Sequence, residues 1–154
     1  MKIKIDDLNG GEVLKLLEEH LADMRAASPA CSVHALDVAS LKSPEITFFS
    51  GWNDNELFGC VAIKQLDQVH AELKSMRTSM SARNSGVATS LLQHVLNIAE
   101  ERGYEQLSLE TGSQGFFQPA RNLYQKFGFE YCAPFAGYQE DPNSRFMTLT
   151  LQAK

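Results

Sequence analysis

The chain has 154 residues, a length typical of one domain and sufficient to bury a hydrophobic core without a disulfide or a metal. Hydrophobic residues make up 44% of it and charged residues 21%, which is typical of a globular domain and excludes a disordered chain. Its formal net charge of −5 disfavours a nucleic-acid-binding function. No apolar run approaches about 18 residues, so we expect no membrane span and no leader, and predict a cytoplasmic location.

The three cysteines, Cys31, Cys60 and Cys132, are widely spaced and odd in number. They form no zinc-type pair, and the four histidines also lack the spacing of metal ligands. We therefore expect reduced thiols and no metal site. One of the histidines, His94, is predicted to face solvent from the middle of a helix.

The first elements in chain order are a short strand and two helices. Polar and apolar residues alternate from Lys2 to Ile5, which predicts a strand. Asn9 is predicted to cap a helix that runs to about Arg25, because apolar residues recur there at helical spacing. A second, shorter helix is predicted from Ser32 to Leu41.

Three strands follow. Ile46 to Trp52 and Leu57 to Ile63 are apolar runs on either side of the turn residues Asn53 to Asn55, so they predict a β-hairpin. Val69 to Met80 is a further extended segment. Its imperfect alternation predicts a strand interrupted by a bulge.

The second half alternates helices with strands. The strongest helical periodicity in the chain begins at Ser85 and ends near Arg102. A strand is predicted from Gln106 to Glu110, and a helix from Pro119 to Phe127. Two late strands are predicted from Phe129 to Phe135 and from Phe146 to Leu151. This order predicts a single α/β domain over residues 1–154, with a mixed, mostly antiparallel sheet flanked by helices.

The segment from Arg83 to Ala88 joins a predicted strand to the longest amphipathic helix. A small-residue loop entering a helix presents unpaired backbone N–H groups, and the helix dipole adds positive charge there. Together these predict an anion site suited to a pyrophosphate, which Gly86 lets approach closely and Arg83 supplements with a charge. The spacing matches neither G-x-x-x-x-G-K-[ST] nor G-x-G-x-x-G. The alternative is an ordinary helix start with a glycine in its first turn.

Two blocks resemble the GNAT acyltransferase family. Arg83, Gly86 and Ala88 match the family's [QR]-x-x-G-x-[GA] signature at a strand-to-helix junction. A second block resembles the family's A-x-x-L-Y-x-K-x-G-F pattern; its matching residues are Ala120, Leu123, Tyr124, Lys126, Gly128 and Phe129. The resemblance covers essentially the whole chain. Two positions depart from it: Phe117 stands where the family often has Asn, and Asn84 where Gly is usual.

The resemblance implies a GNAT-type fold that transfers an acetyl group from acetyl-CoA to an amine of a small molecule or peptide. It implies direct attack in a ternary complex, in keeping with the lack of a recognisable Ser/His or Cys/His nucleophile. The resemblance assigns ten residues to acetyl-CoA binding: Met76, Arg77, Thr78, Arg83, Asn84, Ser85, Gly86, Val87, Ala88 and Thr89. The backbone of the first three, on a predicted strand, would pair with pantetheine and supply an oxyanion donor.

Two catalytic roles follow from the resemblance. Tyr124 is the candidate proton donor to the departing thiolate, with a core tyrosine as the alternative. Glu72, eleven residues before Arg83, is the candidate base, and Glu110 at the end of the next strand is the second candidate. The segment from Phe135 to Asp141 either shapes the acceptor pocket or is a surface loop.

Two other functions stay open at this stage. A GNAT-like domain could bind acyl-CoA as a sensor or docking module without turnover, or it could use a longer acyl donor. A homodimer is compatible with a small α/β enzyme, but no sequence feature requires one.

Overall fold

Seven strands form one open sheet in the order β1-β2-β3-β4-β5-β7-β6 in this computed structural model, which describes residues 1–29 and 38–151. The strands are β1 (Lys2–Ile5), β2 (Ile46–Asn53), β3 (Glu56–Gln65), β4 (His70–Thr78), β5 (Gln106–Gly112), β6 (Glu130–Cys132) and β7 (Ser144–Thr150). Only β4 and β5 pair in parallel; every other neighbouring pair is antiparallel. The predicted fold class is confirmed.

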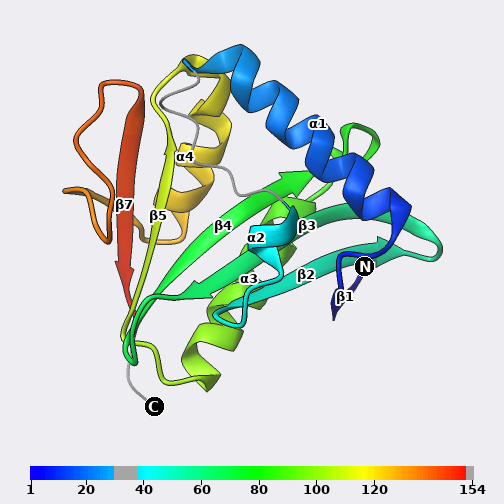
Figure 1. Ribbon diagram of the computed structural model, residues 1–154, viewed down its shortest axis with the longest axis horizontal. Coiled ribbons are helices and arrows are strands. Elements are labelled where there is room, and N and C mark those ends of the chain that lie inside the picture. Colours follow the sequence, from blue (N-terminus) through cyan, green and yellow to red (C-terminus); the bar gives the residue numbers. More distant parts are fainter. Residues whose placement is uncertain (30–37, 152–154) are drawn as a thin grey trace.

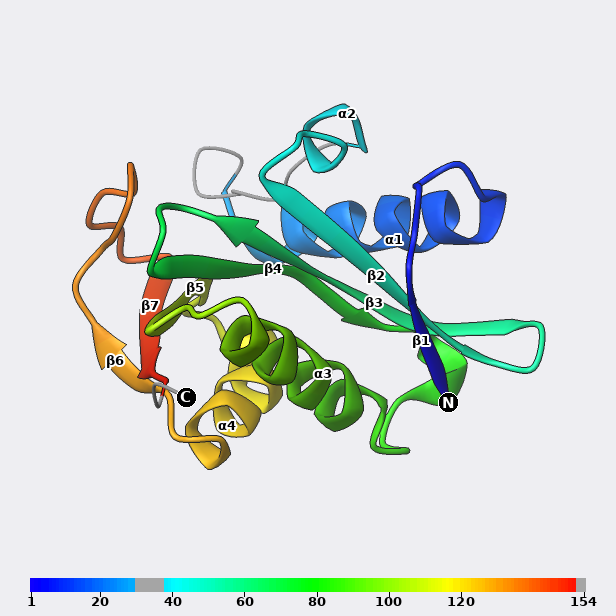
Figure 2. The same ribbon diagram turned by 90° about the horizontal axis from the view of Figure 1, so that it is seen from below.

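The helices cover both faces of this sheet. On one face lie α1 (Gly11–Ala27) and the short α2 (Val38–Leu41), and on the other lie α3 (Val87–Glu101) and α4 (Gln118–Lys126), as Figure 2 shows. Short 3₁₀ turns at Met80–Ala82 and Gly115–Phe117 precede α3 and α4.

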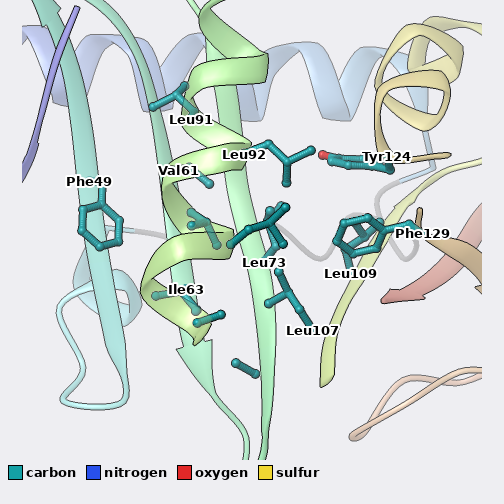
Figure 3. Close-up of a cluster of buried hydrophobic side chains, with 14 of the residues drawn as sticks. Phe49, Val61, Ile63, Leu73, Leu91, Leu92, Leu107, Leu109, Tyr124 and Phe129 are labelled. Carbon is teal, nitrogen blue, oxygen red and sulfur yellow. The ribbon is translucent and has the colours of Figure 1, made fainter. Parts of the chain in front are cut away.

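The larger core lies between the sheet and the pair α3 and α4. Leu107 and Leu109 are two residues apart on β5, so their side chains point to this same face, as their spacing predicts, and both are almost fully buried. They meet Leu91 and Leu92 of α3 in the cluster drawn in Figure 3. Full burial of each such leucine contributes about 1.5–3 kcal/mol, so this cluster fixes the position of both helices on the sheet.

A second, smaller core attaches α1 to the opposite face. Val13, Leu16 and Leu17 of α1 pack with Phe48 of β2 and Ala62 of β3. Because this core lies near the start of α1, the later turns of the helix extend across the end of the sheet at which β4 and β5 separate (Figure 1).

That separation is the feature of the sheet that matters for function. β4 pairs with β3 as far as Thr78, through a bulge at Ser75, whose φ is 55°. Its parallel pairing with β5 covers only His70 to Glu72. Beyond Glu72 the edge of β4 that faces β5 therefore has no strand partner in the described chain, and the sheet opens. The predicted bulge is confirmed.

Two helix starts differ from the sequence prediction. The N-cap of α1 is Gly10 and not Asn9, whose amide oxygen instead accepts a bond from Lys42 Nζ at 3.1 Å. The helix α3 begins at Val87, two residues later than predicted. Asn84 and Gly86 adopt positive φ values of 64° and 82°, which turn the chain before a helix can start.

Smaller differences concern single segments. The first of the late strands covers only Glu130–Cys132. Of the second predicted helix, only Val38–Leu41 lies within the described residues and is helical. His94 is predicted from the sequence to face solvent, but its ring packs edge-on against the ring of Phe49 at a centroid distance of 4.7 Å. Cys60 and Cys132 are free thiols, and Cys31 lies outside the described residues.

Candidate active site

Two adjoining cavities occupy the opening between β4 and β5. The larger, of about 460 Å³, runs between β4, the start of α3 and α4, and we call it the main groove. The smaller, of about 100 Å³, lies between β4 and β5, and we call it the inner cavity. The residues that line both are His20, Met24, Met76, Phe117, Ala120 and Tyr124. A molecule held in the main groove can therefore present its end to the inner cavity.

The main groove contains nine of the ten residues predicted to bind acetyl-CoA: Met76, Arg77, Thr78, Arg83, Asn84, Gly86, Val87, Ala88 and Thr89. The tenth, Ser85, does not line it. Its hydroxyl turns back and donates to the Ala82 carbonyl, so it supports the shape of the turn instead.

The turn before α3 has the properties of an anion site. Gly86 is the N-cap and no side chain caps the helix, so the N–H groups of its first turn stay available. A side chain on Gly86 would meet no atom within 4 Å, because the residue faces open space at the groove. The half-exposed Arg83 guanidinium stands next to this turn, 4.0 Å from Asp23. Backbone N–H groups, the helix dipole and one arginine thus favour a bound phosphate.

The Arg77 side chain has a structural role. It is buried, and its guanidinium pairs with Asp23 of α1 at 2.6 Å. This ion pair ties the second half of α1 to β4, which keeps His20 and Met24 over the opening. In the sheet Arg77 pairs with Cys60 of β3, and the backbone role predicted for Met76 to Thr78 stays a prediction.

Tyr124 extends from α4 to the junction of the two cavities. Its ring packs against Phe129 at a centroid distance of 5.7 Å, and its hydroxyl points away from α4 toward α3 (Figure 3). Burial, and secondarily the charge of Glu110, raises the pKa of Tyr124 above its usual value. The phenol therefore keeps its proton near neutral pH and remains a hydrogen-bond donor.

Arg121 fixes the start of α4 against the end of β5. This buried guanidinium donates to the carbonyls of Gly112 and Gln114, the latter at 3.2 Å, and to the Gln118 side chain at 2.8 Å. Arg121 lies one helical turn before Tyr124, so this anchor sets the position of the phenol relative to the end of β5. Phe117, at a position where the resemblance to the GNAT family implies Asn, packs tightly against Gly112 and lines both cavities.

Charged side chains of β4 and β5 line the inner cavity. Glu72 is 2% exposed, and its Oε2 accepts bonds from Lys74 Nζ at 3.1 Å and from the Tyr138 hydroxyl at 2.6 Å. Lys74 Nζ also donates to the Tyr138 oxygen at 2.9 Å. These three residues form one hydrogen-bonded cluster, the Glu72–Lys74–Tyr138 triad.

Glu110 lies across the inner cavity on β5. Burial raises the pKa of this carboxyl to about 7, and nearby Glu72 and Asp141 add to the rise. The Ser144 hydroxyl and the Lys74 ammonium act in the opposite direction. A carboxyl that titrates near neutral pH can accept a proton from a substrate under physiological conditions.

A third cavity, of about 410 Å³, opens on the same face of the sheet as α1 and is called here the outer cavity. It is lined by Lys64, Glu72 and the segment 136–141. Since Glu72 lines both the inner and the outer cavity, the triad stands between them. The segment 136–141 therefore borders the candidate site, and its role in shaping the acceptor pocket stays a prediction.

The sequence assigned no individual role to four of the lining residues discussed above: His20, Met24, Lys74 and Tyr138. His20 and Met24 come from α1, and no local pattern shows that this helix crosses the opening. Lys74 could have been found, because residues two apart on a strand point to the same face as Glu72. The bond from Tyr138 to Glu72 joins residues 66 positions apart and has no sequence signal.

His20 is held uncharged. Burial, and secondarily the nearby Arg77 cation, lowers the pKa of its imidazole to about 4, against a smaller opposing effect of Asp23. At neutral pH it offers the cavities a neutral ring.

Comparison with known proteins identifies relatives over nearly the full chain. The sequence model of the acetyltransferase (GNAT) family matches residues 13–129. A Bacillus subtilis protein named uncharacterized N-acetyltransferase YsnE is 58% identical, over 98% of this chain and 100% of its own. The Escherichia coli protein named uncharacterized N-acetyltransferase YedL is 48% identical, over 97% and 94%. An Azospirillum brasilense protein named IAA acetyltransferase is 33% identical, over 88% and 86%.

Solved structures share the fold. A Klebsiella pneumoniae protein described as an acyl-CoA N-acyltransferase superposes with a TM-score of 0.79 at 24% identity, over 98% of this chain and 97% of the other. A GNAT acetyltransferase from Elizabethkingia anophelis, solved with acetyl-CoA bound, superposes with a TM-score of 0.70 at 19% identity, over 97% of each chain.

Residues 1–29 and 38–151 lack two features, a membrane-spanning helix and a cluster of metal ligands. Within them no helix combines the length and apolar character needed to cross a membrane. The same residues contain no group of three or more His, Cys, Asp or Glu side chains arranged to hold a metal ion.

Proposed function

The chain belongs to the GNAT acetyltransferase family, and we propose that it moves an acetyl group from acetyl-CoA to an amine of a small molecule or peptide by direct attack in a ternary complex. The observation that carries this proposal is the meeting of the main groove and the inner cavity at Tyr124. The main groove has a turn suited to bind a phosphate, and the inner cavity has a carboxyl suited to accept a proton.

In this proposal the pyrophosphate of acetyl-CoA lies on the turn from Arg83 to Ala88. The pantetheine arm follows the free edge of β4 beyond Glu72, where backbone groups lack a β5 partner. A backbone N–H between Met76 and Thr78 donates to the thioester oxygen as it becomes an oxyanion. The thioester carbon then lies at the junction of the two cavities.

The acceptor amine enters the inner cavity as an ammonium with a pKa near about 10 and must lose a proton before it attacks. We assign this step to Glu110, with its pKa of about 7. Glu72, the first candidate from sequence, already accepts two bonds at one oxygen, from Lys74 and from Tyr138. That oxygen is therefore already occupied by partners within the protein.

The amine nitrogen forms a bond to the acetyl carbon, and the carbon–sulfur bond then breaks. Tyr124 donates its proton to the departing CoA thiolate. Its raised pKa keeps the proton available until the sulfur becomes negative. No group on the protein becomes acetylated.

Release of free CoA tests this function. Purified protein is mixed with acetyl-CoA and a panel of amines, amino acids, polyamines and peptides, and thiol appearance is followed. We expect thiol release with at least one acceptor. Saturable acetyl-CoA binding without release for any acceptor would instead identify a binding module. Competition between acetyl-CoA and longer acyl-CoA donors, by the same assay, tests the choice of donor.

A further inference from the structure

Lys74 is an unexpected residue for the inner cavity of an enzyme that takes up an amine. It lines the cavity together with Glu110 and Tyr124, and its side chain is 9% exposed. A fixed ammonium repels the cationic acceptor that must reach the same space. A site built for a simple amine or a polyamine would contain carboxylates and no buried lysine.

The charges of the cavity nearly cancel. The Lys74 cation is matched by Glu72 at 3.1 Å, and Glu110 titrates near neutral pH. Only part of one negative charge is then left for the substrate. Such a cavity is complementary to a ligand that has both a positive and a negative group.

Lys74 also keeps a hydrogen bond available. Two of the three N–H bonds of its ammonium have acceptors among residues 1–29 and 38–151, namely Glu72 Oε2 and the Tyr138 oxygen. Both partners hold the ammonium in one position, and the third N–H can bond a ligand oxygen. A charge-assisted bond of this kind is strong in a site closed to water.

From this arrangement we infer that the acceptor is an amine with a carboxylate close to its nitrogen, as in a free amino acid, and that Lys74 binds that carboxylate. The inference rests on the proposed function. The acceptor nitrogen would face Glu110 and the thioester, while the carboxylate would lie against Lys74. Tyr138 and Glu72 are positioning residues that fix the ammonium, and the side chain of the acceptor would extend past them into the outer cavity.

Matched acceptors test this directly. The common L-amino acids are compared with their carboxamides, with the corresponding decarboxylated amines and with spermidine, by free-CoA release. We expect kcat/KM for at least one free amino acid to exceed that for its carboxamide by about tenfold or more, the usual effect of one hydrogen bond to a charged group.

The variant Lys74→Met removes the charge and keeps the length of the side chain. It should lower kcat/KM for the free amino acid by about tenfold or more, while that for the carboxamide changes by less than about threefold. A merely structural lysine would lower both values equally. Lys15→Met, on an exposed position of α1, is the control.

Lys74→Met leaves the buried Glu72 carboxylate without its cation and could unfold the protein. The double variant Glu72→Gln/Lys74→Met avoids this, and its fold is checked by Tm and acetyl-CoA affinity. It should show the same loss of preference for the free acid.

Two results would overturn the inference. One is a wild-type preference for carboxamides, decarboxylated amines or spermidine over free amino acids, and the other is a preference for free acids that survives in both variants. No thiol release with any acceptor would reject the proposed function and this inference together, whereas release with the wrong class of amine rejects the inference alone.

Discussion

The main groove and the inner cavity differ in what builds them. One wall of the groove is formed by two short runs of the chain, Met76 to Thr78 and, apart from Ser85, Arg83 to Thr89, and we propose that this wall binds through backbone geometry at a strand edge and a helix start. The inner cavity is formed by side chains of α1, β4, β5 and α4. Backbone sites of this type serve one constant ligand, while side chains can change to suit different acceptors. The two regions should therefore respond differently to mutation.

The largest effect is expected at Gly86. Gly86→Glu places a negative side chain at the mouth of the proposed phosphate site and should abolish measurable binding of acetyl-CoA by calorimetry. The matched control is Gly103→Glu. Gly103 has nearly the same φ, 79° against 82°, and equal free space, so both variants incur the same backbone strain of about 1–2 kcal/mol. Acetyl-CoA binding that is lost in both variants, or in neither, would show that the turn is not the site.

The next largest effect is expected at the junction of the two regions. Tyr124→Phe should lower kcat by about 100-fold, because the thiolate loses its proton donor, with little change in acetyl-CoA affinity. Steady-state rates and calorimetry separate the two effects. Tyr131→Phe, on exposed β6, should change neither. An unchanged kcat in Tyr124→Phe would show that Tyr124 is not the proton donor and that its ring serves only in packing.

Glu110→Gln should affect the acceptor side alone. In the wild-type protein, kcat/KM should fall as pH drops below about 7, because Glu110 then holds a proton. The variant should lose about tenfold or more at pH 8 and show a flat profile through this range. Glu72→Gln is the informative comparison: if it flattens the profile and Glu110→Gln does not, Glu72 is the base.

The Glu110→Gln variant should also be more stable than the wild-type protein. The pKa of the Glu110 carboxyl is about 7 in the folded chain and has its ordinary value of 4.5 when the chain is unfolded, so the native state holds more protons between these values. The free energy of unfolding of the wild-type protein therefore falls as pH rises through this window. Glu110→Gln should be more stable than the wild type by roughly 1–3 kcal/mol at pH 8 and equally stable at pH 4, by urea unfolding.

The smallest effect is expected at His20. Its imidazole, with a pKa of about 4, is neutral throughout the active range. His20→Asn should therefore change the size of kcat/KM modestly and leave the midpoint of its pH profile in place. A shift of that midpoint would mean that His20, and not Glu110, is the group that titrates.

The contrast between the regions also explains what could be predicted from sequence. The element order, the presence of a bulge in β4 and most of the groove residues between Arg83 and Thr89 depend on local periodicity and on a short motif. The exact start of α3 depends on two positive φ values, which no pattern specifies. The inner cavity depends on long-range packing, because α1 reaches it through the Arg77–Asp23 pair and Tyr138 reaches Glu72 from a distant loop.

Direct transfer between the two regions is tested most directly by initial rates, with acetyl-CoA and a productive acceptor from the panel both varied. Attack in a ternary complex predicts double-reciprocal lines that intersect, and intact protein of unchanged mass after incubation with acetyl-CoA alone. Parallel lines, together with an added acetyl group on the protein, would contradict direct transfer at Tyr124 and Glu110.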